Sequence, residues 1–292
     1  MAVTQQEQVA QPNLAEQIET WFQRWGTFVV ALVIFVIFSL TADHFFTVQN
    51  MQNILRQVSI TAVVAIGMTL VILIGGIDLS VGAVVLFSAA VMNTLLFNEI
   101  MPAVPAIIVG IAAASLVGII NGLGVVKAKI SPVIVTLGMM VMIRGLGGML
   151  LWINNSWLWV RHAIFTYVKA ESIFGIPVSA VIMIVLYIIA SIVMRKTSFG
   201  RHVYAIGGNE RAAELCGIPV GRVKIMVYML AGFFAGIGGF MMSARLSAIS
   251  PGVGLGLEFE AITAVILGGT SLSGGVGRVE KTLLGAIIVA MI

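Results

Sequence analysis

One segment of the sequence comes close to a nucleotide-binding motif. The run Gly275-Val-Gly-Arg-Val-Glu-Lys-Thr282 nearly matches the phosphate-binding pattern G-x-x-x-x-G-K-[ST]. That pattern needs a glycine before the lysine, because the backbone there must wrap around the phosphates. Glu280 occupies this position and adds both bulk and negative charge. We therefore expect that this segment does not hydrolyse ATP.

Polar residues within long apolar stretches are the second set that could do chemistry. A charged side chain at mid-membrane costs about 3 kcal/mol on insertion scales unless it faces protein or water. Asp78 follows the Gly75-Gly76 pair, and Arg144 lies inside an apolar run. These side chains could line a path for a hydroxyl-rich solute, whereas helix–helix hydrogen bonds, snorkelling or a structural ion pair would explain each one taken singly. The pathway residues that we predict are Thr61, Asp78, Ser80, Asn121, Thr136 and Ser271.

The sequence gives little indication of an enzyme. Its three histidines are isolated in predicted loops, so we predict no metal site and no cofactor. Glu258 and Glu260 lie at the entrance of an apolar stretch, where solvation at the membrane interface is the simpler interpretation. A single cysteine, Cys216, excludes an internal disulfide framework. Lysines and arginines are not interleaved with aromatic residues, so we expect no nucleic-acid binding.

The polar segment 195–222 contains the pattern of a short, capped helix. Asn209 is a good N-cap, Glu210 suits the positive end of a helix, and Gly217 suits the position after its end. Pro219 then prevents continuation. A helix of about two turns is only marginally stable alone in water. We therefore predict that 209–217 docks into the groove of a partner, and a plain connecting loop is the alternative.

These residues must be positioned by a protein whose solvent is lipid. Of the 292 residues, 60% are hydrophobic and only 10% are charged, and the mean hydropathy is +1.10. A soluble domain carries about 25% charged residues. Backbone groups in lipid must pair internally, which leaves helices or a closed barrel. The apolar runs are continuous and longer than the alternating segments of about ten residues in barrels. The fold class is therefore an all-α polytopic membrane protein.

Nine apolar stretches are candidates for membrane spans. The eighth is too short to cross comfortably, and whether it crosses or re-enters is open. Residues 1–25 are polar and lack the basic flank of a signal peptide, so we expect a tail followed by an uncleaved anchor. The chain stops at Ile292 within an apolar run, which we interpret as a truncation. The stretches are 26–42, 54–74, 81–97, 105–126, 132–153, 178–194, 223–244, 259–272 and 282 onward.

The distribution of basic residues predicts an orientation. Lysine and arginine favour the cytoplasmic side of a membrane. With the N-terminus inside, eleven of the 16 lysines and arginines fall in cytoplasmic segments and four fall outside, while Arg144 lies within a span. The reverse orientation inverts this ratio. We therefore expect 1–25 to be a cytoplasmic tail and 26–292 the membrane domain.

Glycine patterns indicate broken and closely packed helices. Residues 71–82 resemble 265–275 with one gap, since in both an apolar run ends at a glycine pair (Gly75-Gly76 and Gly268-Gly269). Interrupted helices at corresponding places of two halves point to a transport pathway, although a chance likeness between two helix ends is the alternative. The pairs Gly118-x-x-x-Gly122 and Gly232-x-x-x-Gly236 predict close helix packing.

Several motifs together resemble a known family of membrane proteins. Arg211-Ala-Ala-Glu-Leu-Cys-Gly217 is similar to the E-A-A-x-x-x-G loop of ABC importer permeases. The other matches are to permeases of the ribose/xylose/arabinose type and span about 54–292. They are Phe199-Gly-Arg-His-Val-Tyr-Ala-Ile-Gly-Gly-Asn-Glu210, Gly76-Ile-Asp-Leu-Ser-Val-Gly82, Ile120-Asn-Gly122, Pro132-x-x-x-Thr-Leu-Gly138 and Gly268-Gly-Thr-Ser-Leu-Ser-Gly-Gly275.

The resemblance implies a function and a set of partners. It implies about ten membrane helices arranged in two related halves, and the last of these helices is missing from this sequence. It also implies a location in the inner membrane of a bacterium. The partners would be cytoplasmic ABC ATP-binding subunits, a periplasmic sugar-binding protein and a second permease, identical or paired. The cargo would be a monosaccharide or similar polyol, and 195–222 would be the coupling loop. The coupling residues implied are Asn209, Glu210, Arg211, Ala212, Ala213, Glu214 and Gly217.

Departures from the family pattern and rival functions remain. Arg211 stands where the pattern begins with glutamate, and Glu280-Lys281 stands where small residues are usual. A secondary carrier or facilitator needs no ATPase, but its ion-coupled form should carry a network of membrane carboxylates, for which Asp78 is the one credible candidate. A membrane scaffold without transport is the third alternative. The identity of the sugar is not encoded in these motifs.

Overall fold

In the part of the chain that the structure describes, the protein is a bundle of α-helices with four very short strands. The computed structural model describes residues 14–42, 44–154, 157–160 and 162–291, and only the backbone of 14–25. Residues 1–13 of the predicted cytoplasmic tail, and Ile292, lie outside the described residues. The helices are α1 (Leu14–Thr41), α2 (Val48–Leu73), α3 (Val81–Phe97), α4 (Ala103–Val126), α5 (Pro132–Ile153), α6 (Ala163–Ala170), α7 (Val178–Lys196), α8 (Ser198–Gly208), α9 (Glu210–Leu215), α10 (Val220–Leu246), α11 (Leu257–Leu267) and α12 (Val279–Met291).

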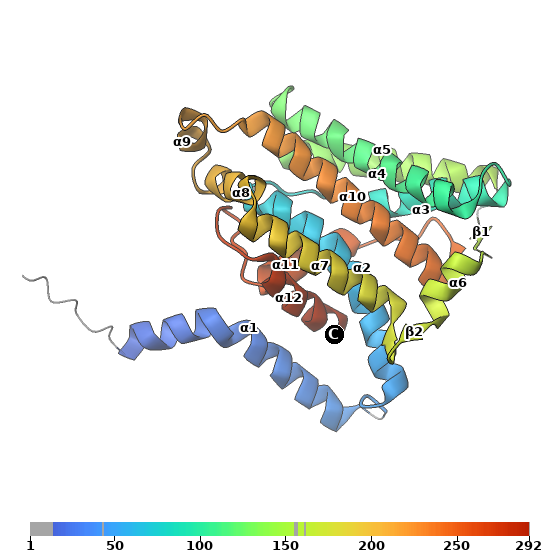
Figure 1. Ribbon diagram of the computed structural model, residues 1–292, viewed down its shortest axis with the longest axis horizontal. Helices are drawn as coiled ribbons and strands as arrows, with labels where there is room; N and C mark the ends of the chain where they lie inside the picture. Colours follow the sequence, from blue (N-terminus) through green and yellow to red (C-terminus); the bar gives the residue numbers. More distant parts are fainter. Residues whose placement is uncertain (1–13, 43, 155–156, 161, 292) are drawn as a thin grey trace, which may run out of the picture.

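The two ends of the bundle carry different elements. Helices α8 and α9 lie at one end, here called the α9 end, and α6 lies at the other, the α6 end (Figure 1). At the α6 end, strand β1 (Leu158–Trp159) pairs antiparallel with β4 (Ala248–Ile249), and β2 (Ser172–Ile173) pairs with β3 (Ile176–Pro177). These two strand pairs hold the connecting segments together at the α6 end, and the long helices form the rest of the bundle.

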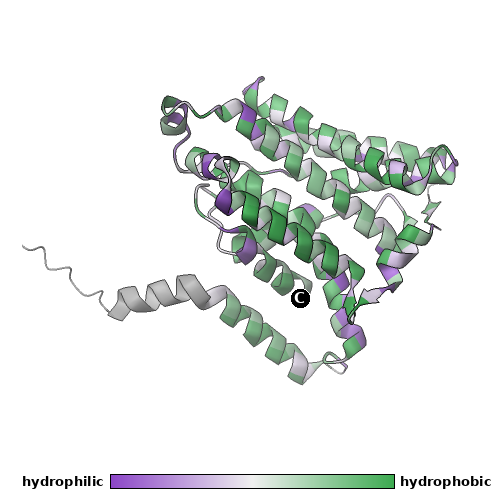
Figure 2. Ribbon diagram, viewed as in Figure 1, coloured by the Kyte–Doolittle hydropathy of each residue, from purple (hydrophilic) through white to green (hydrophobic). Residues whose placement is uncertain are grey.

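The fold class predicted from composition is confirmed. Five helices, α2, α4, α5, α7 and α10, are long and apolar enough to cross a membrane, and α3 is a shorter apolar helix. Hydrophobic residues follow the lengths of these helices, and hydrophilic residues gather at the bundle ends and in loops (Figure 2). Helix α2 begins six residues before the predicted apolar stretch, because the Thr47 hydroxyl accepts a hydrogen bond from the Asn50 N–H and caps a polar first turn.

Helix α2 forms the centre of the bundle, and glycines let other helices approach closely. Residues 58–73 of α2 are all buried. The predicted close packing at the two glycine pairs is confirmed, because α4 and α10 contact each other through them. A Cβ added at Gly118 would lie 2.1 Å from the Tyr228 carbonyl oxygen, and one at Gly232 would lie 2.3 Å from that of Ala114. Backbones at this distance leave no room for side chains.

The segment between α10 and α12 runs from one end of the bundle to the other. It starts at the α6 end, where the Lys169 ammonium donates to the Ser247 hydroxyl (2.8 Å), and reaches the α9 end, where the Tyr204 hydroxyl donates to the Gly277 carbonyl (3.0 Å). The one helix within this segment is α11, which has 11 residues and lies near the middle of the segment. At 1.5 Å per residue it covers roughly half of the ~30 Å hydrocarbon core. The segment that includes 259–272 therefore runs the length of the bundle and is helical only in its middle.

Candidate functional site

Helix α9 is a short capped helix at the exposed end of the bundle. The Asn209 side-chain oxygen accepts a hydrogen bond from the Ala212 N–H (2.9 Å). Gly217 has φ +78°, a left-handed conformation that favours glycine, and directly follows the C-cap residue Cys216. The signals read from the sequence at both ends of this helix therefore lie at cap positions in the structure.

Most residues of α9 are exposed. Ala213 is its one buried residue, whereas the Leu215 side chain is 84% exposed. The Glu210 carboxylate forms an ion pair with the Lys224 ammonium (2.7 Å), which ties the start of α9 to α10. An exposed leucine on a tethered two-turn helix is suited to contact with another protein, because burial of a leucine stabilises an interface by roughly 2 kcal/mol.

The end of α8 contacts both loops that carry the repeated glycine motif. Helix α2 ends at Leu73, just before Gly75-Gly76, and α11 ends at Leu267, just before Gly268-Gly269. The two loops are joined where the Gly275 N–H donates to the Leu73 carbonyl oxygen (2.9 Å). A Cβ added at Gly207 of α8 would lie 1.8 Å from that oxygen and 2.4 Å from the Gly275 nitrogen. We call this meeting point of Leu73, Gly207 and Gly275 the glycine junction.

Four of the six predicted pathway residues gather around the loop after α2. The Asp78 carboxylate accepts hydrogen bonds from the Ser80 N–H (2.9 Å) and hydroxyl (2.6 Å). The Asn121 amide donates to the Ser80 hydroxyl (2.9 Å), and the Thr136 hydroxyl accepts from the Leu79 N–H (3.1 Å). All four predicted side chains are buried. Their hydrogen bonds connect this loop to α4 and α5.

The same region contains buried polar atoms without a partner among the described residues. They are the Asn121 side-chain oxygen and the hydroxyl of Tyr228, a residue that sequence reasoning missed. A Cβ added at Gly76 would lie 2.6 Å from this hydroxyl. Tyr228 lies within an apolar run of the sequence. The one feature that could have indicated its role is a phenol hydroxyl inside a predicted membrane span. Unpartnered buried polar groups are costly, and they suit a site that receives a polar group during function.

The other two predicted pathway residues lie elsewhere. The Thr61 hydroxyl on α2 donates to the Glu260 carboxylate (3.0 Å). Ser271 lies in the loop after α11, where its hydroxyl accepts from the Ser273 N–H (3.2 Å). The six residues therefore belong to three separate places, and only the group around Asp78 forms a connected set.

The interpretation of Glu258 as a solvated residue is wrong. Glu258 is only 6% exposed, and its Oε2 atom lies against Gly82 at the start of α3. The segment that precedes α11 reaches α3 within the bundle, because Gly254 and Gly256 take positive φ values and let the chain turn. The apolar pattern contains no signal for this turn, because it is made by glycines at positive φ, and so the pattern alone predicts a surface position for Glu258.

Arg144 holds the non-helical segment before α11. Its guanidinium donates to the carbonyl oxygens of Pro251, Val253 and Gly254, each at 3.4 Å. Carbonyl groups outside helices need partners at membrane depth, because lipid offers none. Arg144 therefore supplies hydrogen bonds to irregular backbone, which neither the snorkelling nor the ion-pair interpretation anticipated.

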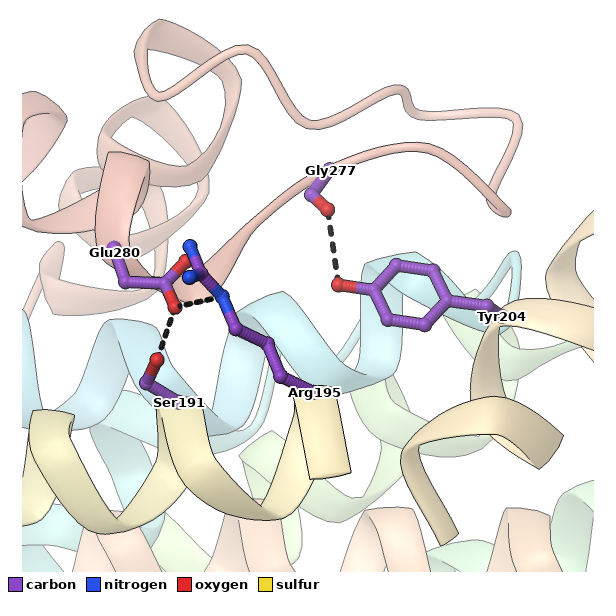
Figure 3. Close-up of polar contacts among 5 residues, drawn as sticks. All are labelled: Ser191, Arg195, Tyr204, Gly277 and Glu280. Atoms are coloured by element: carbon purple, nitrogen blue, oxygen red, sulfur yellow. Dashed lines mark hydrogen bonds and ion pairs between the residues drawn. The ribbon is translucent and has the colours of Figure 1, made fainter. Parts of the chain in front are cut away.

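Glu280, the residue that spoils the nucleotide-binding motif, has other partners. Its carboxylate accepts a hydrogen bond from Ser191 and pairs with Arg195 (2.8 Å), while Tyr204 holds Gly277 (Figure 3). Desolvation alone would raise the pKa of Glu280. The Ser191 hydroxyl, the backbone N–H and the Arg195 charge outweigh it, so the pKa lies below its ordinary value.

Comparison with known proteins identifies close relatives over most of the chain. The family model described as "Branched-chain amino acid transport system / permease component" matches residues 50–292. The ribose import permease protein RbsC of Bacillus subtilis is 40% identical over 91% of this chain and 83% of its own length. RbsC of Escherichia coli K12 is 37% identical (94% and 86%), and the L-arabinose ABC transporter permease protein AraH of Azospirillum brasilense is 36% identical (92% and 78%). No solved structure matches the chain.

Proposed function

Because this chain belongs to the family of branched-chain amino acid transport system permease components, we propose that it is the membrane-spanning subunit of an ATP-driven importer for a monosaccharide or similar polyol. The similarity to ribose import permeases and to an L-arabinose ABC transporter permease, over more than nine-tenths of the chain, carries this proposal. The five apolar helices long enough to cross a membrane support it. The multi-pass chain works in a bacterial inner membrane.

The partners of the chain follow from the same proposal. ATP-binding subunits supply the energy, a periplasmic sugar-binding protein delivers the cargo, and a second permease copy, identical or paired, completes the membrane unit. The N-terminus is cytoplasmic, so the α9 end faces the cytoplasm. The excess of basic residues in the segments at that end supports this orientation.

The coupling contact to the ATP-binding subunits is helix α9 with its flanking turns. The exposed Leu215 and the ion pair between Glu210 and Lys224 support this role. A tethered, capped helix transmits a movement of the ATP-binding subunits better than a free loop does, because its conformation is already fixed. Its residues are Asn209, Glu210, Arg211, Ala212, Ala213, Glu214 and Gly217.

Sugar passes beside the broken helices. The buried group of Asp78, Ser80, Asn121 and Thr136 supports a polar route, because two unpartnered oxygen atoms lie in the same region. Alternating access opens this region to one side and then to the other. The predicted pathway residues Thr61, on α2, and Ser271, in the loop after α11, lie outside this group.

Reconstitution in liposomes tests the proposal directly. The chain is combined with its ATP-binding subunits and with its binding protein, and uptake of radiolabelled ribose or arabinose is followed with and without ATP. We expect uptake of at least one sugar that needs ATP and both partners. Uptake by the chain alone that collapses when an uncoupler is added would instead assign it to the secondary carriers.

A second measurement separates the coupling role from transport itself. The segment 209–217 is replaced by a scrambled sequence of the same composition, and copurification of the ATP-binding subunits is measured. We expect that association is lost while the membrane domain still elutes as a single species. Unchanged association would remove α9 from the contact and leave the family assignment intact.

A further inference from the structure

A pocket at the α9 end is lined by three arginines from different segments. It has a volume of about 510 Å³ and opens between the end of α7, helix α8 and the loop before α12. Arg195 comes from α7, Arg201 from α8 and Arg278 from the loop. Tyr204 also lines it, and its hydrogen bond to Gly277 fixes α8 against the loop (Figure 3). We call this site the arginine pocket.

The arginine pocket has an uncompensated positive charge. Glu280 is the one acid in its lining, and this carboxylate is already bound by Arg195 and Ser191. Arg201 and Arg278 are exposed, and neither forms an ion pair with another described residue. Three guanidinium groups and one carboxylate leave a net charge of two positive units. The pocket therefore favours an anion.

An apolar track leads from the membrane region to the pocket. Exposed isoleucines and a valine lie on one face of α7, and Arg195 follows Ile192 by three residues, so it continues the same face one turn later. Buried Met194 and Val279 form the apolar part of the pocket wall. A ligand with an anionic head and apolar chains would satisfy both surfaces. The exposed residues of the track are Ile184, Val185, Ile188, Ile189 and Ile192.

We propose that the arginine pocket binds the phosphate of an anionic phospholipid, whose acyl chains lie along α7. Guanidinium groups bind phosphate oxygens through paired, charge-assisted hydrogen bonds. Basic pockets at the ends of membrane helices are suited to anionic headgroups. Free phosphate offers the same head but would leave the apolar track unused. The lipid bridges α7, α8 and the loop before α12, two of which meet at the glycine junction.

Lipid retention tests this proposal without any transport measurement. The chain is purified in mild detergent from vesicles of phosphatidylethanolamine and phosphatidylglycerol, and retained lipid is measured by native mass spectrometry. The double variant Arg201→Gln/Arg278→Gln is compared with Arg222→Gln, which removes an exposed arginine at the α9 end outside the pocket. We expect phosphatidylglycerol retention to fall about tenfold or more in the double variant and to stay unchanged in the control.

Three results would overturn the proposal. The first is equal retention in the double variant and the control, provided that both elute as single species. The second is release of the lipid by excess inorganic phosphate from the wild type together with phosphate binding to the lipid-free chain, which would assign the pocket to soluble phosphate. In the third, the double variant loses the ATP-binding subunits but keeps the lipid, which would make the pocket a protein contact. The first result leaves the importer assignment untouched.

Discussion

At the scale of the residue, single polar side chains fix the local conformations that the site needs. Asn209 caps α9, Ser80 links Asp78 to Asn121, and Arg144 holds three backbone carbonyl groups. In each case a side chain supplies the hydrogen bond that a helix end or an irregular segment lacks. Because these bonds replace backbone pairing, their loss should have local effects that are larger than those of ordinary surface substitutions.

The N-cap of α9 offers the first prediction. Asn209→Ala removes the acceptor for the Ala212 N–H, which costs about 1 kcal/mol of helix stability. If α9 is the coupling helix, association with the ATP-binding subunits should weaken about fivefold. Asn209→Asp keeps a good cap and is the matched control. The affinity of the purified subunits for each variant is measured by surface plasmon resonance, and equal affinities for all three proteins would contradict the expectation.

The ion pair of Glu280 with Arg195 predicts a dependence on pH. The folded-state pKa of Glu280 lies below its ordinary value of 4.5. Its stabilisation is therefore fully present above that ordinary value and is lost as the pH falls through the lowered value. The midpoint temperature of thermal unfolding should thus fall on acidification from about pH 6 to about pH 3, and it should fall less in the Glu280→Gln variant.

Glu214→Gln is the control for that measurement. Glu214 is exposed on α9 and forms no ion pair with a described residue. Its substitution should leave the acid-dependent drop unchanged. If Glu280→Gln and the wild type lose the same number of degrees on acidification, the ion pair does not contribute to the acid sensitivity of the fold.

At the scale of the element, the glycine junction connects the end of α8 to both broken helices. Leu73, Gly207 and Gly275 meet through backbone atoms, so the contact has almost no side chain that could deform. Packed backbones transmit displacement because they are not compressible. We expect a movement of α8 and α9 to reach the loops after α2 and after α11 together.

Substitution at Gly207 tests the junction, and its neighbour is a matched control. In Gly207→Ala the new Cβ would lie 1.8 Å from the Leu73 carbonyl oxygen, so the backbones must separate. Gly208→Ala meets nothing within 4 Å. Overpacking costs about 1–3 kcal/mol. ATP-dependent uptake should fall about tenfold or more in Gly207→Ala and remain at the wild-type rate in Gly208→Ala. Equal rates for the two variants would mean that the junction is not needed for coupling.

At the scale of the whole molecule, the single cysteine reports the orientation. Cys216 is exposed at the α9 end, and the chain has no second cysteine. With the N-terminus in the cytoplasm, a membrane-impermeant maleimide should label Cys216 in inverted vesicles and not in intact spheroplasts. Labelling is read from the mass of the purified protein, and labelling in spheroplasts alone would reverse the orientation.

A second variant makes the orientation experiment symmetrical. Phe174 lies between β2 and β3 at the α6 end, and its side chain is fully exposed. The double substitution Cys216→Ser/Phe174→Cys moves the thiol to the opposite end. We expect its labelling pattern to be the inverse of the wild-type pattern. Labelling of both proteins from the same side would contradict a bundle whose two ends face opposite sides of the membrane.

Features that depend on local chemistry could be predicted from the amino-acid sequence. Low charge and long apolar runs require internally paired helices in lipid, so the helical membrane fold could be predicted from composition. The cap at Asn209 and the left-handed Gly217 follow from the conformational preferences of those two residues. The close packing of α4 and α10 could also be predicted, because Gly118 and Gly232 are each followed one helical turn later by a second glycine.

Contacts between residues far apart in the chain became known only from the folded structure. The burial of Glu258 depends on a chain reversal before α11 that apolar periodicity does not record, because the turn uses glycines at positive φ rather than polar residues. The contact of Gly207 with two loops, and the meeting of Arg195, Arg201 and Arg278, join segments far apart in the chain. Such contacts depend on helix packing across the bundle, and a single sequence contains no local signal for that packing.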